Sequence, residues 1–299
     1  MNNLQTPKNP ELFYKLVDSH NKEDHLKLIE MIKEENLNPC QIKSLDFYTI
    51  LGVMLIRNKD VAKILVKYSD DSKVPDSLNS HWYSACLLKK SQLGLLKLAL
   101  KAGKKSINHC RIKEDGEHIH STPFACLIDK TYSNYPVAKF GKPIHYSYDK
   151  IITPSITFML ENGANINSYY GKTQKHVVSS MLQYYPFMNY YYKDILNLSL
   201  KYGFNPNSLV EKNTNKDNFY GHIFKQKNNS DVDVLKFCTF IFNEYNIIPD
   251  IEHVNSDGKN IITLANEANL VGVLSFLENI AIKKVLNTPN TVIKTKNRL

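Results

Sequence analysis

The chain has 299 residues, 42% of them hydrophobic, which is enough to bury a sizeable core or to build an extended array. It carries 38 basic and 29 acidic residues, a formal net charge of +9 that favours an acidic partner, although solvated surface lysine is the plainer explanation. Five widely spaced cysteines exclude a disulfide framework and indicate reduced, buried thiols of an intracellular, cytoplasmic protein.

The first residues, MNNLQTPKNPELF, contain no basic segment followed by an apolar core, so we expect no Sec-type signal peptide. The segment that follows, near residues 10–39, is polar, as the exposed side of a terminal repeat needs to be. Its charged residues include Glu23, Asp24, Glu30, Glu34 and Glu35. We therefore expect this segment to close the N-terminal end of an array.

One phrase recurs along the chain: an apolar helix end, a turn residue and a short extended segment. It is clearest at residues 96–108, 156–167 and 195–207, with weaker copies at 29–39, 63–74, 240–250 and 274–282. The turn residues are Asn36, Ser69, Gly103, Gly163, Gly203, Asn246 and Ile280. Their separations of 33, 34, 60, 40, 43 and 34 residues indicate a fixed unit with insertions. Glycine and asparagine suit the left-handed end of a helix, whereas Ile280 fits poorly and indicates a degenerate last unit.

Each unit is predicted to contain two antiparallel helices. In the third unit, Leu93, Leu96 and Leu100 have the spacing of a buried helical face, while Leu95 and Leu98 make a second side apolar, as a helix between two neighbours requires. The predicted units lie near 10–39, 44–74, 78–108, 109–167, 168–207, 208–250 and 255–285. Residues 286–299 form a basic C-terminal tail. The most apolar stretch, 261–282, is interrupted by polar residues and is too polar for a membrane span.

Several phrases carry a resemblance to a known family. Thr122-Pro123 opens the fourth unit, Thr173 and His176 follow the same pattern in the fifth, and LENGANIN ends the fourth at residues 160–167. The chain resembles the ankyrin-repeat family, whose unit of 33 residues is a turn plus two helices with the signature T-P-L-H-x-A. A TPR-like array would show its own aromatic and alanine positions, which are absent.

The resemblance implies an all-α ankyrin-repeat solenoid of about seven irregular helix-turn-helix units with short hairpin fingers, forming a single array over residues 1–285. It also implies that His176 has a structural role, bonding the backbone between repeats.

Two insertions depart from the plain repeat, at 131–152 in the fourth unit and at 184–192 in the fifth. Both are rich in tyrosine and phenylalanine. One interpretation is a tyrosine-rich patch that binds a partner, because tyrosine is enriched at binding hot spots. The other is a local core in which the two insertions pack on each other.

Motifs for catalysis, cofactors or metals are not evident. Phosphate-binding loops and nucleophile or zinc-protease motifs are missing, and Cys86 and Cys126 occupy small buried positions of the repeat. The nearest approach to a zinc site is His109, Cys110, His118 and His120, which lacks a C-x2-C pair. We therefore expect no metal and no cofactor. No helix-turn-helix, zinc-finger or aromatic RNA-platform motif points to a nucleic acid.

The expected function is that of a monomeric scaffold or adaptor, not an enzyme, which binds another protein through its fingers and concave face. The residues expected to contact the partner are Trp82, Tyr83, Lys104, Lys105, His118, His120, Tyr169, Tyr170, Tyr190 and Tyr191. Trp82, the single tryptophan, fits the core equally well. The alternative is an enzyme whose site is built from the insertions 131–152 and 184–192.

The composition, rich in lysine, asparagine, isoleucine and tyrosine, and the irregular repeats are similar to those of ankyrin effectors that intracellular bacteria deliver into host cells by a non-Sec system. Ankyrin proteins of large viruses and protists have the same character.

Overall fold

The computed structural model describes residues 3–44, 48–75, 77–87, 92–109, 111–112, 118–119, 122–132, 154–183, 187–188 and 190–287. The chain divides into two compact units. Unit 1 comprises Met1–Tyr184 and Asp194–Phe204, and unit 2 comprises Tyr185–Lys193 and Asn205–Leu299. The prediction of a single array over 1–285 therefore stays a prediction.

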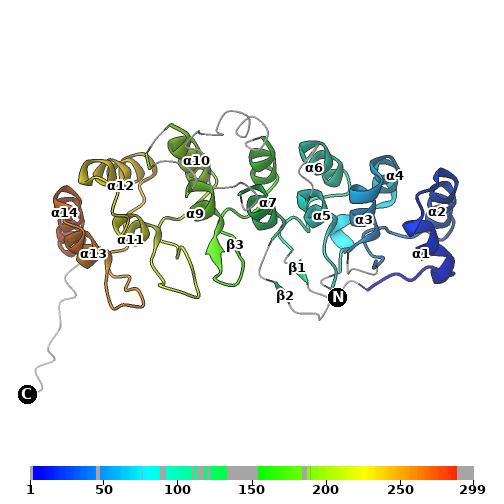
Figure 1. Ribbon diagram of the computed structural model, residues 1–299, viewed down its shortest axis with the longest axis horizontal. Coiled ribbons are helices and arrows are strands. Elements are labelled where there is room, and N and C mark those ends of the chain that lie inside the picture. Colours follow the sequence, from blue (N-terminus) through cyan, green and yellow to red (C-terminus); the bar gives the residue numbers. More distant parts are fainter. Residues whose placement is uncertain are drawn as a thin grey trace, which may run out of the picture. The chain divides into compact units, whose positions relative to one another are not determined.

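Unit 1 contains helix pairs that follow the predicted repeats one to five (Figure 1). Its helices are α1 (Pro10–Asp18), α2 (Lys22–Glu34), α3 (Ile50–Arg57), α4 (Lys59–Leu65), α5 (His81–Leu87), α6 (Gln92–Leu100), α7 (Pro123–Tyr132), a helix at 154–161, α9 (Val177–Leu182) and the greater part of α10 (Tyr190–Lys201). Two 3-10 turns, η1 (Val66–Tyr68) and η2 (Asp71–Lys73), follow α4.

Unit 2 contains two further helix pairs, repeats six and seven. They are α11 (Phe219–Phe224) with α12 (Asp231–Tyr245), and α13 (Ile261–Glu267) with α14 (Val271–Asn287). Among the described residues, no helix combines the length and the apolar character needed to cross a membrane.

Short antiparallel hairpins precede the first helices of repeats four and five. Strand β1 (Arg111–Ile112) pairs with β2 (His118–Ile119), and β3 (Tyr169–Tyr170) pairs with β4 (Lys175–His176). Figure 1 shows these hairpins below the row of first helices, with the second helices α2, α4 and α6 above that row. The predicted hairpin fingers are thus present in these two repeats.

The first helices of unit 1 form its core. Helix α3 packs on α5, α5 on α7 and α7 on α9. Residues 50–55 of α3 and 81–86 of α5 are all buried, because each short helix is covered on both sides by its neighbours. This burial explains why these helices are apolar around their circumference.

Polar side chains fix where the first helices begin. Thr122 accepts a hydrogen bond from the amide of Ala125 over 3.2 Å, and Asn218 accepts one from Gly221 over 2.9 Å. His176 has the same role at α9, where its Nδ1 accepts from the amide of Val178 over 3.2 Å. The prediction that Thr173 and His176 match the signature threonine and histidine was therefore misplaced, since His176 lies at the capping position itself.

Five of the seven predicted turn residues adopt the left-handed backbone that ends a helix: Asn36, Gly103, Gly163, Gly203 and Asn246. Ser69 has a φ of −98° and follows a 3-10 turn instead. Ile280 was the wrong marker, because it lies inside α14. Repeat seven does have a left-handed residue, Asn269, with a φ of 54°, but it follows the first helix, α13, and is therefore not the counterpart of the other turn residues, which follow second helices.

An asparagine at the end of one repeat binds the backbone at the end of the next. The Asn108 side chain donates to the carbonyl of Gly163 over 2.8 Å and accepts from the amide of Asn165 over 2.8 Å. We call this pair of bonds an asparagine clamp. Contacts of the same kind are made by Asn38, Asn167 and Asn207.

Candidate functional site

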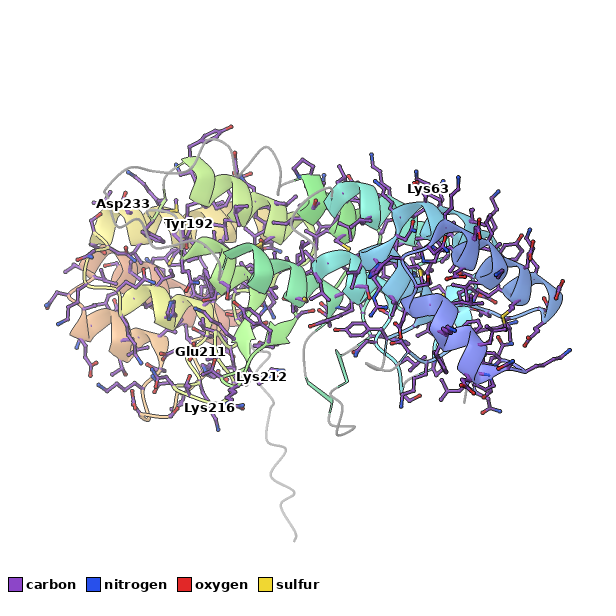
Figure 2. All side chains as sticks on the ribbon, turned by 45° about the vertical axis from the view of Figure 1, so that its right-hand side comes forward. Lys63, Tyr192, Glu211, Lys212, Lys216 and Asp233 are labelled. Atoms are coloured by element: carbon purple, nitrogen blue, oxygen red, sulfur yellow. The ribbon has the colours of Figure 1, made fainter. Side chains whose placement is uncertain are left out.

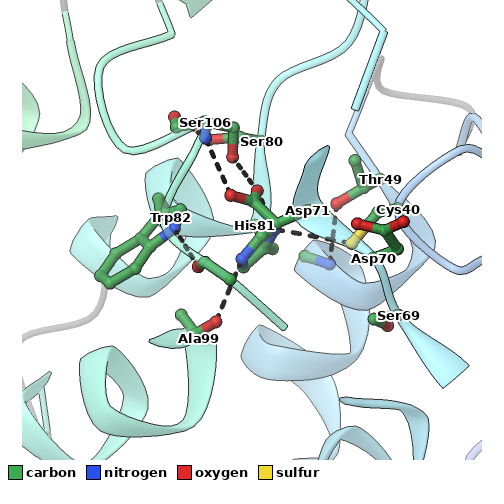
Figure 3. A network of polar contacts seen from close by, with 12 residues as sticks. Cys40, Thr49, Ser69, Asp70, Asp71, Ser80, His81, Trp82, Ala99 and Ser106 are labelled. Atoms are coloured by element: carbon green, nitrogen blue, oxygen red, sulfur yellow. Dashed lines mark hydrogen bonds and ion pairs between the residues drawn. The ribbon is translucent and has the colours of Figure 1, made fainter. Parts of the chain in front are cut away.

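A buried carboxylate joins repeats two and three, where the asparagine clamp is missing (Figure 3). Asp71, only 2% exposed, accepts hydrogen bonds from the Ser106 amide over 2.8 Å and from the Ser106 hydroxyl. Its own amide donates to the carbonyl of Ala102 over 2.9 Å. Because both carboxylate oxygens find donors, the buried charge is compensated.

His81 and Cys40 lie beside this carboxylate. His81 Nδ1 is 3.6 Å from Asp71 Oδ1 and 3.7 Å from Cys40 Sγ, and its Nε2 donates to the carbonyl of Ala99 over 3.2 Å. Burial lowers the pKa of His81 by more than the neighbouring Asp71 carboxylate raises it. Burial, reinforced by the Asp71 charge, raises the pKa of the Cys40 thiol.

The arrangement of cysteine, histidine and aspartate has the residue types of a nucleophilic triad, but not its chemistry. A nucleophilic cysteine needs a lowered pKa and access to a substrate. Cys40 is a neutral thiol, and both Cys40 and His81 are fully buried. The network therefore joins repeats one, two and three and offers no reaction site.

A pocket of about 440 Å³ opens on α1 and α3, the first helices of repeats one and two. Val17 and Val53 provide its buried apolar part. Asp18 and Arg57 form an ion pair at the pocket, with side chains that are 50% and 42% exposed. Tyr14 completes the lining and donates its hydroxyl to the carbonyl of Lys43 over 2.8 Å. The pocket thus combines an apolar interior with exposed charged groups.

Two of the residues expected to contact a partner are in the core. Trp82 is 0% exposed and donates its indole N–H to the carbonyl of Gly103 over 3.0 Å, and Tyr83 is also buried. A partner cannot reach either side chain, so their assignment as contact residues was wrong. Lys104 and Lys105 are exposed in the turn after α6, before β1, and are accessible.

The remaining predicted contact residues have different environments. Tyr169 and Tyr170 are half-buried on β3; Tyr169 packs edge-on against His176, and the Tyr170 hydroxyl donates to Ser180 over 2.7 Å. Tyr190 is 73% exposed at the start of α10. The side chains of His118 and Tyr191, and the whole of His120, lie outside the described residues.

The second aromatic insertion packs inward where it is described. Phe187 lies 5.2 Å from Tyr192 and 5.7 Å from Phe237 of α12, measured between ring centroids, and Tyr192 is buried. These two residues contribute to the core of unit 2. The insertion 131–152 lies almost wholly outside the described residues, as does Cys110, so neither the first aromatic insertion nor the enzyme alternative gains support.

Sequence analysis missed the pocket residues. Asp18 and Arg57 are the last residues of α1 and α3, so charge at the ends of two successive first helices was the available signal. It was not conclusive, because charged helix ends are common in any soluble protein.

No known family's model matches the sequence, and no curated protein matches it. The fold, by contrast, is similar to solved structures. The ankyrin repeat domain of Bcl-3, described as a unique member of the IkappaB protein family, is 12% identical with a TM-score of 0.50, and the match covers 91% of this chain and 100% of that domain. An ankyrin repeat protein from Leishmania major is 14% identical with a TM-score of 0.54, and the match covers 90% of this chain and 81% of that one. The paired helices, the left-handed turns and these two likenesses together show that the chain has the ankyrin-repeat fold.

Proposed function

We propose that this chain is a protein-binding module, and that its partner places a side chain in the pocket on α1 and α3 while contacting the hairpin fingers and the exposed turn at Lys104 and Lys105. Ankyrin-repeat folds generally bind proteins. The observation that carries the proposal is the pocket itself, with Val17 and Val53 inside and the Asp18–Arg57 pair exposed beside them.

This combination suits a binding hot spot. Partner side chains that dominate affinity fill small apolar pockets, and the surrounding polar groups orient them. The Asp18–Arg57 pair contributes little to folding, because both side chains are about half exposed to water. Removal of the pair should therefore leave the fold intact, so a loss of binding in such a variant would report on recognition and not on folding.

The proposal can be tested with peptides selected from a random library for binding to the full chain. We expect Arg57→Ala to lower the affinity for most selected peptides by about tenfold or more. Val53→Phe, which fills the pocket, should have the same effect. Fluorescence anisotropy measures the affinities, and circular dichroism checks the fold of each variant.

Lys236→Ala is the matched control, because Lys236 is also an exposed cation paired with a carboxylate, Asp233, at 3.7 Å. The affinity of this control variant for the selected peptides should stay within about twofold of that of the wild type. If the peptides bind Arg57→Ala and Val53→Phe as well as they bind the wild type, the pocket is not the binding site and the proposal fails.

The comparisons do not support the expected delivery into a host cell. The monomeric state, the cytoplasmic location and the absence of catalytic activity also stay predictions.

A further inference from the structure

Four lysines repeat at corresponding positions of two neighbouring second helices. Lys63 lies on α4, and Lys67 lies in the η1 turn that continues it. Lys97 lies on α6, and Lys101 follows directly after that helix. Each lysine is 34 residues from its counterpart, the separation of the turn residues Ser69 and Gly103. We call these four residues the lysine quartet. All four side chains are exposed, and Figure 2 shows Lys63 on the solvent side of α4.

The quartet is compact because α4 and α6 pack on each other. Packed helices lie about 8–10 Å apart, and residues four apart on one helix lie about 6 Å apart. A further lysine of α4 lies beside α6, because Lys59 Nζ is 3.3 Å from the position that a Cβ on Gly94 would occupy. The positive charges of repeats two and three thus form one surface.

Only one of the four lysines forms an ion pair among the described residues. Lys63 pairs with Asp60 at 2.7 Å, but in the described part of the chain no carboxylate forms an ion pair with Lys67, Lys97 or Lys101. Like charges on neighbouring helical positions disfavour folding slightly, so stability does not explain the quartet. In repeat one, the corresponding positions are Glu30 and Glu34, both exposed.

We infer that the lysine quartet is a second interaction surface, which binds an acidic segment of a protein in extended conformation. An extended chain of the polyproline II type has three residues per turn and rises about 3.1 Å per residue, so carboxylates at every third residue lie on one face, about 9 Å apart, which matches the separation of the two helices. The surface lies on the second helices and is separate from the pocket on α1 and α3.

The chemistry of the surface favours carboxylates over the other anions. Residues 59–75 and 92–109 contain no arginine, the residue best suited to bidentate binding of phosphate. Exposed large hydrophobic side chains, which would insert into a membrane, are absent from α4 and α6 among the described residues. Lysine acts as a point charge and pairs readily with single carboxylates.

The probe is a fluorescein-labelled peptide with four glutamates at every third position, tested against the full chain by fluorescence anisotropy at low and at physiological salt. We expect saturable binding that weakens with salt and is lost when the glutamates are replaced by glutamines. The triple variant Lys67→Glu, Lys97→Glu, Lys101→Glu should weaken binding by about tenfold or more.

Two further variants separate the quartet from the net charge of the chain. Lys22→Glu, Lys27→Glu, Lys33→Glu makes the same charge change on exposed positions of α2 and should alter affinity by less than about threefold. Glu30→Lys with Glu34→Lys extends the lysine rows into repeat one and should strengthen binding.

Three outcomes overturn the inference: equal losses in the two triple variants, tighter binding to phosphatidylserine vesicles or to a 20-base-pair DNA duplex than to the peptide, or no detectable peptide binding. The first would mean a general charge effect, and the second a membrane or nucleic-acid partner.

Discussion

At the residue scale, the contact between Asp71 and the turn that ends repeat three decides the local conformation. Where other repeats use a neutral asparagine clamp, the Asp71 carboxylate binds Ser106. This places Asp71 so close to Gly103 that a Cβ on Gly103 would lie 2.7 Å from the Asp71 Cβ. Gly103 also has a φ of +127°, which side chains disfavour. The sequence predicted the left-handed turn that favours glycine at position 103. It did not predict the close approach of Asp71, because no local pattern pairs residues 71 and 103.

Gly103 and Gly163 provide a matched test of this contact. Gly163 has a φ of +94° and no atom within 4 Å of an added Cβ. We expect Gly163→Ala to destabilise the protein by about 1–2 kcal/mol through backbone strain alone. Gly103→Ala should cost about 1–3 kcal/mol more, because Asp71 must also move. Urea unfolding measures both values, and equal losses would mean that Asp71 yields without cost.

At the element scale, helix ends were more predictable than helix beginnings. Glycine or asparagine at a left-handed position is a local signal, and it located Asn36, Gly103 and Asn246 correctly. Helix α9 begins after His176, which is an unusual capping residue, so no local pattern indicated a helix boundary there. The end of the last repeat was also predicted wrongly. A turn was expected at Ile280, but α14 extends from Val271 to Asn287.

The asparagine clamps connect these ends, and Asn207 in unit 2 allows one to be tested. Its side chain donates to the Ile248 carbonyl over 2.9 Å and accepts from the Asp250 amide over 2.8 Å. Asn207→Ala removes both bonds and should destabilise unit 2 by about 1–2 kcal/mol. Asn207→Asp keeps the acceptor and should lose less.

Asn228→Ala, at an exposed position outside the clamps, is the control and should change stability by less than about 0.5 kcal/mol. Hydrogen exchange of the Asp250 amide is the direct readout, because this amide loses its acceptor only in the alanine variant. Unchanged protection there would contradict the clamp.

At the scale of the whole molecule, the burial of the cysteine thiols was predictable from the sequence. The division of the chain into two compact units was not. Apolar context and an odd count predicted buried, reduced cysteines, and Cys40, Cys86, Cys126 and Cys238 are buried thiols. The pocket and the two compact units depend on contacts between residues far apart in sequence. The insertion at 184–192 was visible from its length, yet its packing on Phe237 was not, since many apolar neighbours could have received it.

The buried thiols make the stability of both units sensitive to alkaline pH. Burial raises the pKa of Cys40 in unit 1, of Cys86 in unit 1 and of Cys238 in unit 2 above the ordinary value of 9.0. Above pH 9 the unfolded chain releases these protons while the folded chain keeps them. The free energy of unfolding is therefore highest below pH 9 and falls as the pH rises.

Between pH 8 and pH 10, an interval centred on the ordinary thiol pKa of 9.0, each thiol lowers the free energy of unfolding by about 1.4 kcal/mol in total, so the three together should lower it by roughly 4 kcal/mol. Urea unfolding at several pH values under reducing conditions measures this slope. Cys238→Ala should reduce the slope by about one proton whatever it does to stability at pH 7, since the alanine has no proton to release. A slope that does not change in this variant would show that Cys238 ionises as readily in the folded chain as in the unfolded one.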